Sequence, residues 1–306
     1  QAARSRKEPR GSPCRSAGRA ARAHMTASLR PQPSRAPAAG RTARARARGS
    51  TKQVQSSAVQ RAARPRPRPL RLDAVAEGGS VQDWLDAGCD GFKGMRTVRP
   101  QAWGIQDTVD GLHDAGALGE DGAVQADVPL GAARGDGGRT ALAAAFRAAA
   151  AQLLAPLAGS GLPAGLLERV RRDAEEVGVA VAEMIPTADK VSLKLELIRE
   201  NVCLRWHQDN YVARAIVSYN CRGTEYVHDD HVDFWELDNC GNNDCVVRDP
   251  AAVCQAGVGD ILLMKGKLFP GAVNGLVHRS PGYEYHPSGV VKARLVLKID
   301  VRRAMS

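Results

Sequence analysis

The sequence predicts an α+β protein with a helical region followed by a strand-rich C-terminal domain. Up to about residue 184 the apolar residues recur at helical spacing, and after Lys190 they alternate with polar residues, as in a strand with one wet face. Short strands separated by Gly, Asn and Asp turns are typical of a sandwich or barrel. We therefore expect a leader over 1–72, a helical region over 73–189 and a β domain over 190–306.

The basic charge of the chain is concentrated in residues 1–72. This segment has 19 Lys and Arg but one acidic residue, whereas the rest has 24 basic and 32 acidic residues. A segment rich in Arg, Ala, Ser and Pro cannot bury enough apolar surface to fold, and its composition fits a transit peptide to a plastid or mitochondrion. There are two alternatives. The segment is a disordered tail without a targeting signal in a cytoplasmic protein, or Arg64–Arg71 is a basic arm that binds nucleic acid.

The remainder of the chain is mildly acidic, so we expect its folded part not to bind nucleic acid. No window holds 18 consecutive apolar residues, so we expect no membrane-spanning helix. Seven cysteines without a secretory hydrophobic region indicate a reducing compartment and mostly free thiols.

In the region 73–189, apolar spacing predicts helices, and Gly and Asp predict one inserted loop over Gly119–Gly138. Thr140 is the expected N-cap of the Ala-rich helix, and Pro186 ends the helical run. The expected helices cover Val81–Leu85, Gln101–His113, Thr140–Leu157 and Leu162–Met184.

In the region 190–306, alternating or continuous apolar residues predict the strands of the β domain. The expected strands cover Val191–Leu197, Ala213–Tyr219, Asp260–Met264 and Ala293–Val301.

Five of the seven histidines lie between residues 207 and 286. His207 and Asp209 are two residues apart, so in an extended chain their side chains point the same way and can share one metal ion. His278, which follows an expected strand and precedes a turn, is the best third ligand. Two histidines and one carboxylate on one face of an octahedron leave three positions open, as in non-haem Fe(II) oxygenases.

Three basic residues are candidates for binding a co-substrate or substrate beside this metal. Arg294, on the last expected strand, has the planar fork that binds a carboxylate with two hydrogen bonds, which is what the far carboxylate of 2-oxoglutarate requires. Arg214 follows Asp209 by five residues and Lys265 precedes a glycine, so both can reach into the same pocket. A solvated strand side chain and a wet turn are the alternatives for Arg214 and Lys265.

The order of His-x-Asp, a Gly-Asp strand start, a distal His and an Arg resembles the Fe(II)/2-oxoglutarate dioxygenase superfamily. The resemblance implies a double-stranded β-helix (cupin-like, jelly-roll) domain, ligation of iron by His207, Asp209 and His278, and binding of 2-oxoglutarate by Arg294. Arg294 follows His278 by 16 residues, which is farther than usual in that superfamily.

A closer resemblance, over about Leu193–Val301, is to the domain-of-unknown-function family 1826. That family has no established activity, so the likeness implies a domain and a set of important residues rather than a reaction. The matching residues are Trp206-His207-x-Asp209, Arg214, Gly223-Thr224-Glu225, Lys265-Gly266 and His278-Arg279-Ser280-Pro281.

Two further groups of possible ligands occur in the β domain. His228, His231 and Asp233 form a second histidine cluster, and the neighbouring acidic residues indicate a solvent-exposed loop. Cys240, Cys245 and Cys254, with Cys221, offer thiolates, although their spacing matches no common zinc knuckle. For Glu225 we expect a pairing with Arg214 or Arg279.

The function predicted from the sequence is an Fe(II)- and 2-oxoglutarate-dependent oxygenase acting on an unidentified small molecule or protein. The alternative is a non-enzymatic, cupin-like protein that binds zinc or iron in metal homeostasis. In a third interpretation the His and Asp side chains only stabilise turns of a scaffold.

Overall fold

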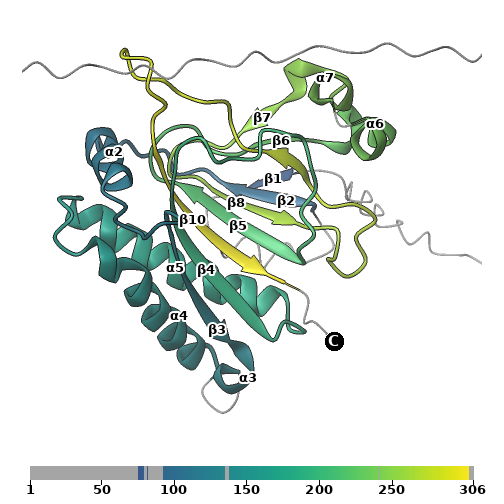
Figure 1. The fold of residues 1–306 in the computed structure, drawn as a ribbon. Coiled ribbons are helices and arrows are strands. Elements are labelled where there is room, and N and C mark those ends of the chain that lie inside the picture. The colour runs from purple at the N-terminus through teal and green to yellow at the C-terminus, as the bar shows by residue number, and fades with distance from the viewer. Residues whose placement is uncertain (1–74, 79–80, 82–91, 135–137, 241, 303–306) are drawn as a thin grey trace, which may run out of the picture. The chain divides into compact units, whose positions relative to one another are not determined.

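The computed structural model describes residues 75–78, 81, 92–134, 138–240 and 242–302, all of them within one unit, residues 65–306. The expected leader over 1–72 and nearly all of the expected helix Val81–Leu85 lie outside the described residues. Among those described, the chain forms helices and two largely antiparallel sheets (Figure 1).

The larger sheet of the described chain has seven strands. Only β1 and β2 pair in parallel, and the other neighbours pair antiparallel. In spatial order the strands are β1 (Val75–Gly78), β2 (Gly94–Thr97), β8 (Ile261–Lys265), β5 (Ala213–Ser218), β10 (Arg294–Val301), β4 (Lys190–Ile198) and β3 (Ala123–Pro129).

The smaller sheet contains β7 (Cys254–Gln255), β6 (Glu225–Val227) and β9 (Val277–Arg279), in that order. An isolated antiparallel bridge between His207 and His278 continues it by one more extended segment. Apolar side chains of the two sheets pack against each other, because Tyr226 and Leu276 share a buried cluster with Leu262 and Met264 of β8.

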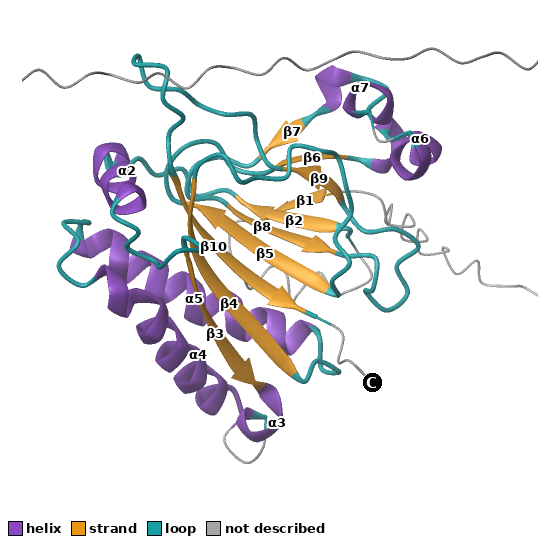
Figure 2. Ribbon diagram, in the orientation of Figure 1, coloured by secondary structure: helices purple, strands orange, loops and turns teal. Residues whose placement is uncertain are grey.

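Two long helices, α4 (Gly138–Leu154) and α5 (Ala164–Met184), cover the other face of the larger sheet (Figure 2). Gly178 of α5 allows their close approach, because a Cβ there would lie 2.4 Å from the ring of Phe146 in α4. The segment Gly138–Leu157 is long and apolar enough to cross a membrane by length and composition alone, and it buries Leu142, Phe146 and Leu153 within this unit.

The remaining helices are short. They are α2 (Gln106–Asp114), α3 (Leu130–Ala133), α6 (Phe234–Asn239), α7 (Asn243–Val246) and the 3-10 turns η1 (Ala155–Leu157), η2 (Asp229–His231) and η3 (Pro250–Ala252).

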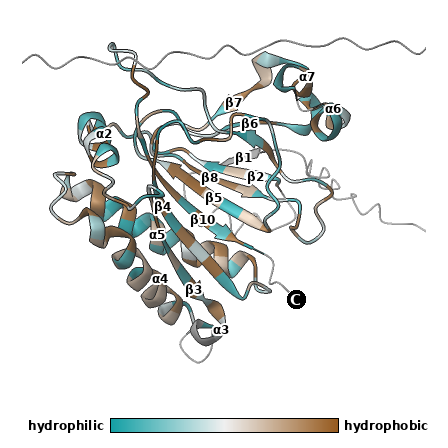
Figure 3. Cartoon of the chain, in the orientation of Figure 1, coloured by the Kyte–Doolittle hydropathy of each residue, from teal (hydrophilic) through white to brown (hydrophobic). Residues whose placement is uncertain are grey.

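Alternation along β10 gives the larger sheet two different faces. Leu295, Leu297 and Ile299 join the buried cluster with the helices. Figure 3 shows hydrophobic residues along the central strands of this sheet. Arg294, Val296, Lys298 and Asp300 lie on the opposite face, because successive side chains of a strand alternate. Arg214, which pairs with Asp300, lies on that second face with Arg294, whereas Lys265 pairs with Ala213, a residue of the buried cluster with the helices.

The predicted mixture of helices and antiparallel strands is confirmed, with the helices of 140–157 and 162–184 and all four predicted strands present within a few residues of their expected bounds. The expected loop over Gly119–Gly138 was wrong, since β3 and α3 lie within it. Val124, Ala126 and Val128 alternate there with polar residues, a strand signal that the flanking glycines obscured. Strands β1, β2 and β3 all come from the region expected to be helical, and they join the same sheet as β4.

Candidate metal centre

His207, Asp209 and His278 lie together at one edge of the smaller sheet. One ligand atom from each lies within 4.8 Å of the other two. Nε2 of His207 is 3.7 Å from Oδ1 of Asp209, and Nε2 of His278 is 3.5 Å from Oδ2 of the same carboxylate. Two atoms bonded to one ion at about 2.1 Å lie roughly 3.0 to 3.5 Å apart, so small movements of these side chains close a coordination sphere.

The backbone and the Nδ1 atoms fix how the two imidazoles face. His207 and His278 exchange both backbone hydrogen bonds, each 3.0 Å long. Nδ1 of His207 lies 2.8 Å from the carbonyl of Arg205, and Nδ1 of His278 lies 2.9 Å from the carbonyl of Leu276. A carbonyl only accepts, so each Nδ1 carries a proton, which leaves each Nε2 facing Asp209 as the ring atom available to a metal ion.

The carboxylate of Asp209 accepts a hydrogen bond from Arg214 of the larger sheet, and Arg214 is in turn paired with Asp300. Nη1 of Arg214 donates to Oδ2 of Asp209 at 2.9 Å, while Nε and Nη2 of Arg214 donate to both oxygens of Asp300 at 2.6 and 2.9 Å. Arg214 and Asp300 are direct neighbours in the β5–β10 pairing. The side chain of Arg214 therefore orients a candidate ligand, and no sequence pattern indicated that Asp300 takes part.

Burial differs between the two histidines. The side chain of His278 is 6% exposed, whereas that of His207 is 32% exposed. Burial lowers the pKa of His278 to about 4, the nearby Asp209 carboxylate counteracting this in part. His278 is therefore neutral at physiological pH, the form that binds metals, and the open side of the cluster lies toward His207.

Lys265 and Arg294 lie apart from the three clustered residues. Lys265, the last residue of β8, lies opposite Ala213 of β5. Its ammonium group lies over the rings of Phe92 and Phe269. Lys265 and the two phenylalanines also line a cavity of about 310 Å³. Arg294 opens β10 on the same face as Asp300, six residues away, which is roughly 20 Å along an extended strand.

Arg294 is a buried cation, 9% exposed, and burial lowers its pKa. Among the described residues it has neither an ion pair nor a side-chain hydrogen bond. Glu196 and Glu284 act on Arg294 from beyond ion-pair distance, so an anion directly beside the guanidinium would be stabilised further. Lys298, on the same strand face, is by contrast paired with Glu196 at 2.5 Å.

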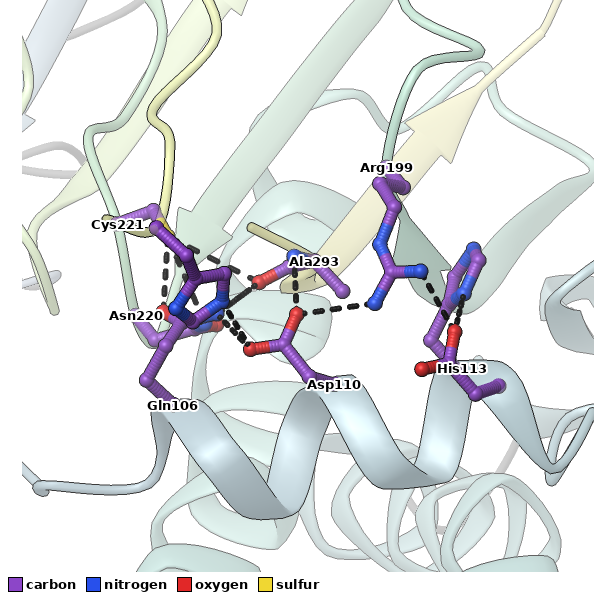
Figure 4. A network of polar contacts seen from close by, with 9 residues as sticks. Gln106, Asp110, His113, Arg199, Asn220, Cys221 and Ala293 are labelled. Atoms are coloured by element: carbon purple, nitrogen blue, oxygen red, sulfur yellow. Dashed lines mark hydrogen bonds and ion pairs between the residues drawn. The ribbon is translucent and has the colours of Figure 1, made fainter. Parts of the chain in front are cut away.

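A polar network holds the backbone on both sides of Arg294 (Figure 4). Asp110 of α2 accepts a hydrogen bond from the backbone nitrogen of Ala293 at 2.7 Å and pairs with Arg199 at 3.1 Å. Asn220 donates to the carbonyl of Ala293 and accepts from the nitrogen of Leu295. His286 also contacts Asp110, its Nε2 atom lying 2.8 Å from Oδ2 of that carboxylate.

The other sequence candidates have different surroundings. Glu225 pairs with Arg279 at 2.7 Å rather than with Arg214, and the Arg279 guanidinium lies over the ring of Trp206, which is buried. Asp233, expected as a possible ligand beside His228 and His231, caps α6 by accepting from the nitrogen of Glu236.

Of the four cysteines considered, the described structure brings Cys240 and Cys245 together. The third potential ligand beside them is Glu236, a residue that sequence reasoning had not selected. Cys254 lies in β7, and Cys221 lies next to Gln106 and the carbonyl of Ala293.

The fold and the site together define a protein of two packed sheets whose edge carries a two-histidine, one-carboxylate cluster. The chain belongs to the family described as "Protein of unknown function (DUF1826)", whose model matches residues 139–300. This match confirms the resemblance that was predicted from Trp206-His207-x-Asp209 and His278-Arg279-Ser280-Pro281. No curated protein matches the chain.

Solved structures similar to the chain include two that contain 2-oxoglutarate. One is the dioxygenase for auxin oxidation 1 from Arabidopsis thaliana, with 10% identity, a TM-score of 0.39, and coverage of 76% of this chain and 94% of that chain. The other is a full-length Neurospora crassa protein in complex with alpha-KG, with 9% identity, a TM-score of 0.32, and coverage of 69% of this chain and 74% of that chain.

Proposed function

We propose that the protein is an Fe(II)- and 2-oxoglutarate-dependent oxygenase in which His207, Asp209 and His278 bind the metal. The observation that carries this proposal is that the Nε2 atoms of both histidines face one carboxylate, while both Nδ1 atoms donate hydrogen bonds to backbone carbonyls. Ligating histidines in metal sites are oriented in this way. Three ligands with one exposed side leave room for small molecules.

The sheet arrangement supports a double-stranded β-helix for this domain. Strands β4, β10, β5 and β8 are consecutive neighbours in one sheet, and the segment at His207 with β9, β6 and β7 forms the facing sheet. Two facing sheets of four antiparallel strands are the arrangement of a jelly roll. In this proposal the domain extends over 190–306, with β1, β2 and β3 added at the edges of the larger sheet.

The donor set favours iron over zinc for this site. Two imidazole nitrogens and one carboxylate suit ferrous iron with open positions, whereas structural zinc sites are closed by four protein ligands. When bound, ferrous iron supplies the centre at which O₂ and 2-oxoglutarate are converted to succinate and CO₂, with one oxygen atom inserted into a C–H bond of the substrate.

The residues of this chain divide the remaining work among them. Asp300 holds Arg214, and Arg214 holds Asp209 in the orientation that faces both histidines. Arg294, expected to bind the far carboxylate of 2-oxoglutarate, lies roughly 20 Å along β10 from Asp300, which is farther than a 2-oxoglutarate molecule bound at the metal reaches, so its burial suits it to a different anion. We further propose that Lys265 contacts the substrate from the cavity that it lines with Phe92 and Phe269.

Residues 1–72 direct the protein to a plastid or mitochondrion, and the folded part acts on a small molecule or protein without binding nucleic acid or membrane.

Uncoupled turnover tests the proposal. The purified full chain is incubated with Fe(II) and 2-oxoglutarate in air, and succinate is measured. We expect succinate only when both iron and O₂ are present, and a fall of more than about 100-fold in His207→Ala, because losing a ligand exceeds the 10- to 100-fold effect of losing its support. Cys254→Ser, in β7, is the matched control and should behave as wild type.

A second measurement separates the alternatives. Anaerobic addition of 2-oxoglutarate to the iron-loaded protein should give a weak visible charge-transfer band. Stoichiometric iron that depends on His207, without the band and without succinate, would instead favour a non-enzymatic metal-binding protein. Equal, substoichiometric metal in wild type and His207→Ala would favour a scaffold.

A further inference from the structure

A second group of metal-ligating side chains lies outside the candidate metal centre. A carboxylate oxygen of Glu236 and the sulfur atoms of Cys240 and Cys245 all lie within 4.8 Å of one another. Both cysteines are free and exposed, and Glu236 is half-buried. We call these three residues the thiol cluster.

Local structure accounts for the convergence. Glu236 and Cys240 are four residues apart at α6, so they lie on the same side of the helix, and the nitrogen of Cys240 bonds to the carbonyl of Glu236 at 3.0 Å. Asn242 caps α7 and its carbonyl accepts from the nitrogen of Cys245 at 3.1 Å, which turns the chain back.

The frame around the thiol cluster is anchored to the β domain. Val232 and Val247 form an antiparallel bridge on either side of it, and with Val246 they belong to a buried cluster that includes Trp206. Asn243, between the two cysteines, accepts from the nitrogen of Trp206 at 2.9 Å and donates to the carbonyl of Leu204 at 2.8 Å. The turn that carries the thiols is therefore tied to the segment that carries His207.

The surrounding charge favours a cation. Residues 229–249 contain seven acidic side chains and one arginine, Arg248. Arg248 lies 3.5 Å from Asp233, and Lys267 lies 3.7 Å from Asp238, so these cations face other carboxylates. A hydrogen bond with Cys240 and the neighbouring carboxylates raise the pKa of Cys245, and a bound cation would reverse this effect.

We propose that Glu236, Cys240 and Cys245 form a second metal site, which binds one thiophilic divalent cation of the Zn²⁺ class. Two thiolates and one carboxylate are donors that zinc accepts, and tetrahedral Zn–S bonds of about 2.3 Å bring two sulfurs roughly 3.8 Å apart. The present spacing needs side-chain movements of about 1 Å to reach this geometry. The fourth position faces solvent and takes water, so the site is open rather than closed.

The two metal sites differ in donor type, which makes them separable. The candidate metal centre has nitrogen and oxygen donors, whereas the thiol cluster supplies the thiolates. Co²⁺ bound by thiolate gives an intense near-ultraviolet charge-transfer band, and Co²⁺ bound by imidazole and carboxylate does not. The probe is therefore Co²⁺ added to the reduced full chain, followed by displacement with Zn²⁺.

In a His207→Ala background the cobalt–thiolate band should persist and saturate at one equivalent. Cys240→Ser and Cys245→Ser should each weaken Zn²⁺ binding by more than about 100-fold and remove most of the band, and Glu236→Gln should weaken binding by about 10-fold. Cys254→Ser, a half-buried cysteine outside the thiol cluster, is the matched control and should keep the wild-type band and affinity.

Three results would overturn the proposal. They are absence of a thiolate band in the reduced protein, a band that survives both Cys240→Ser and Cys245→Ser, and a protein isolated with Cys240 and Cys245 joined as a disulfide that binds no Zn²⁺ after reduction. Circular dichroism of each variant guards against misfolding, because a folded variant that loses the band supports the proposal. None of these outcomes depends on oxygenase activity.

Discussion

The candidate metal centre and the thiol cluster differ in what holds their ligand atoms in place. His207 and His278 lie on paired extended segments, and every ligand has a partner behind it: two carbonyls for the imidazoles and Arg214 for Asp209. The thiol cluster lies on helices of six and four residues, and both of its cysteines are exposed.

The contrast shows that one protein can carry a metal site whose ligands are oriented before the ion binds and another whose ligands become ordered when the ion binds. At the candidate metal centre, the orientation is already determined by hydrogen bonds that do not involve a metal. At the thiol cluster, short helices are marginal on their own, so an ion would add to their stability. Experiments that remove one support at a time can test how far the contrast holds.

The largest effect should follow from removing a ligand of the candidate metal centre. His278→Ala should lower Fe²⁺ affinity by more than about 100-fold, since the loss of a ligand exceeds the loss of its support. Zn²⁺ should still bind to the thiol cluster of the same variant. Isothermal titration with each metal measures both, and parallel loss of the two affinities would contradict the independence of the sites.

The ion pairs beside the two sites should differ strongly in their contribution to stability. In the metal-free protein, Arg214→Met leaves Asp300, 5% exposed, without its cation and should cost about 3–5 kcal/mol of unfolding free energy. Arg248→Met removes an exposed pair with Asp233 near the thiol cluster and should cost less than about 1 kcal/mol. Urea unfolding measures the free energy of unfolding of both variants. An equal loss in the two variants would contradict the proposal that the ion pairs beside the two sites contribute differently to stability.

Arg294 should behave in the opposite way to Arg214, although both are buried arginines. Arg294→Met removes a buried charge that forms no ion pair among the described residues, although Glu196 and Glu284 act on it from farther away, so the unfolding free energy of the ligand-free protein should rise by about 1 kcal/mol. The KM for 2-oxoglutarate should not change, because Arg294 lies roughly 20 Å along β10 from Asp300, beyond the reach of 2-oxoglutarate bound at the metal. Iron affinity should not change, and a loss of iron would place Arg294 in the metal centre instead.

The smallest effect should appear at Glu196, remote from both sites. Burial alone would raise the pKa of this carboxyl, but Lys298 and Lys194 outweigh burial and the folded-state pKa is lowered from 4.5. The unfolded chain then binds the proton more readily, so this contribution to stability is present above pH 4.5 and is lost as the pH falls through the folded-state value.

Glu196→Gln should therefore flatten the decline of stability below about pH 4.5 while leaving metal binding at both sites unchanged. Denaturant unfolding between about pH 6 and pH 3 measures this, with the exposed substitution Glu120→Gln as control. A decline as steep as that of the wild type would show that the pairs with Lys194 and Lys298 contribute nothing.

Much of the candidate site could be predicted because it rests on local spacing. His207 and Asp209 share a direction through the two-residue period of an extended chain, and the order of residues pointed to His278 as their distant partner. Asp300 could not be found in this way, since its role follows from lying opposite Arg214 in the β5–β10 register. Glu236 was missed because its part in the thiol cluster depends on a turn formed by two caps, Asp233 and Asn242.

The fold shows the same division. Regular alternation identified β4 and β10, and helical spacing identified α4 and α5, because each pattern extends over several turns or residue pairs. The short strand β3 was hidden between glycines, and its place beside β4 is decided by long-range pairing.

The amino-acid sequence alone established which residue types are present for metal chemistry and the order in which they occur, since both are properties of the chain. Which atoms face one another depended on the folded molecule: Nε2 rather than Nδ1 toward Asp209, Arg214 between two carboxylates, and Arg294 buried without an ion pair among the described residues. This is because hydrogen-bond direction and burial depend on strand register and on packing between distant segments, which no local pattern specifies.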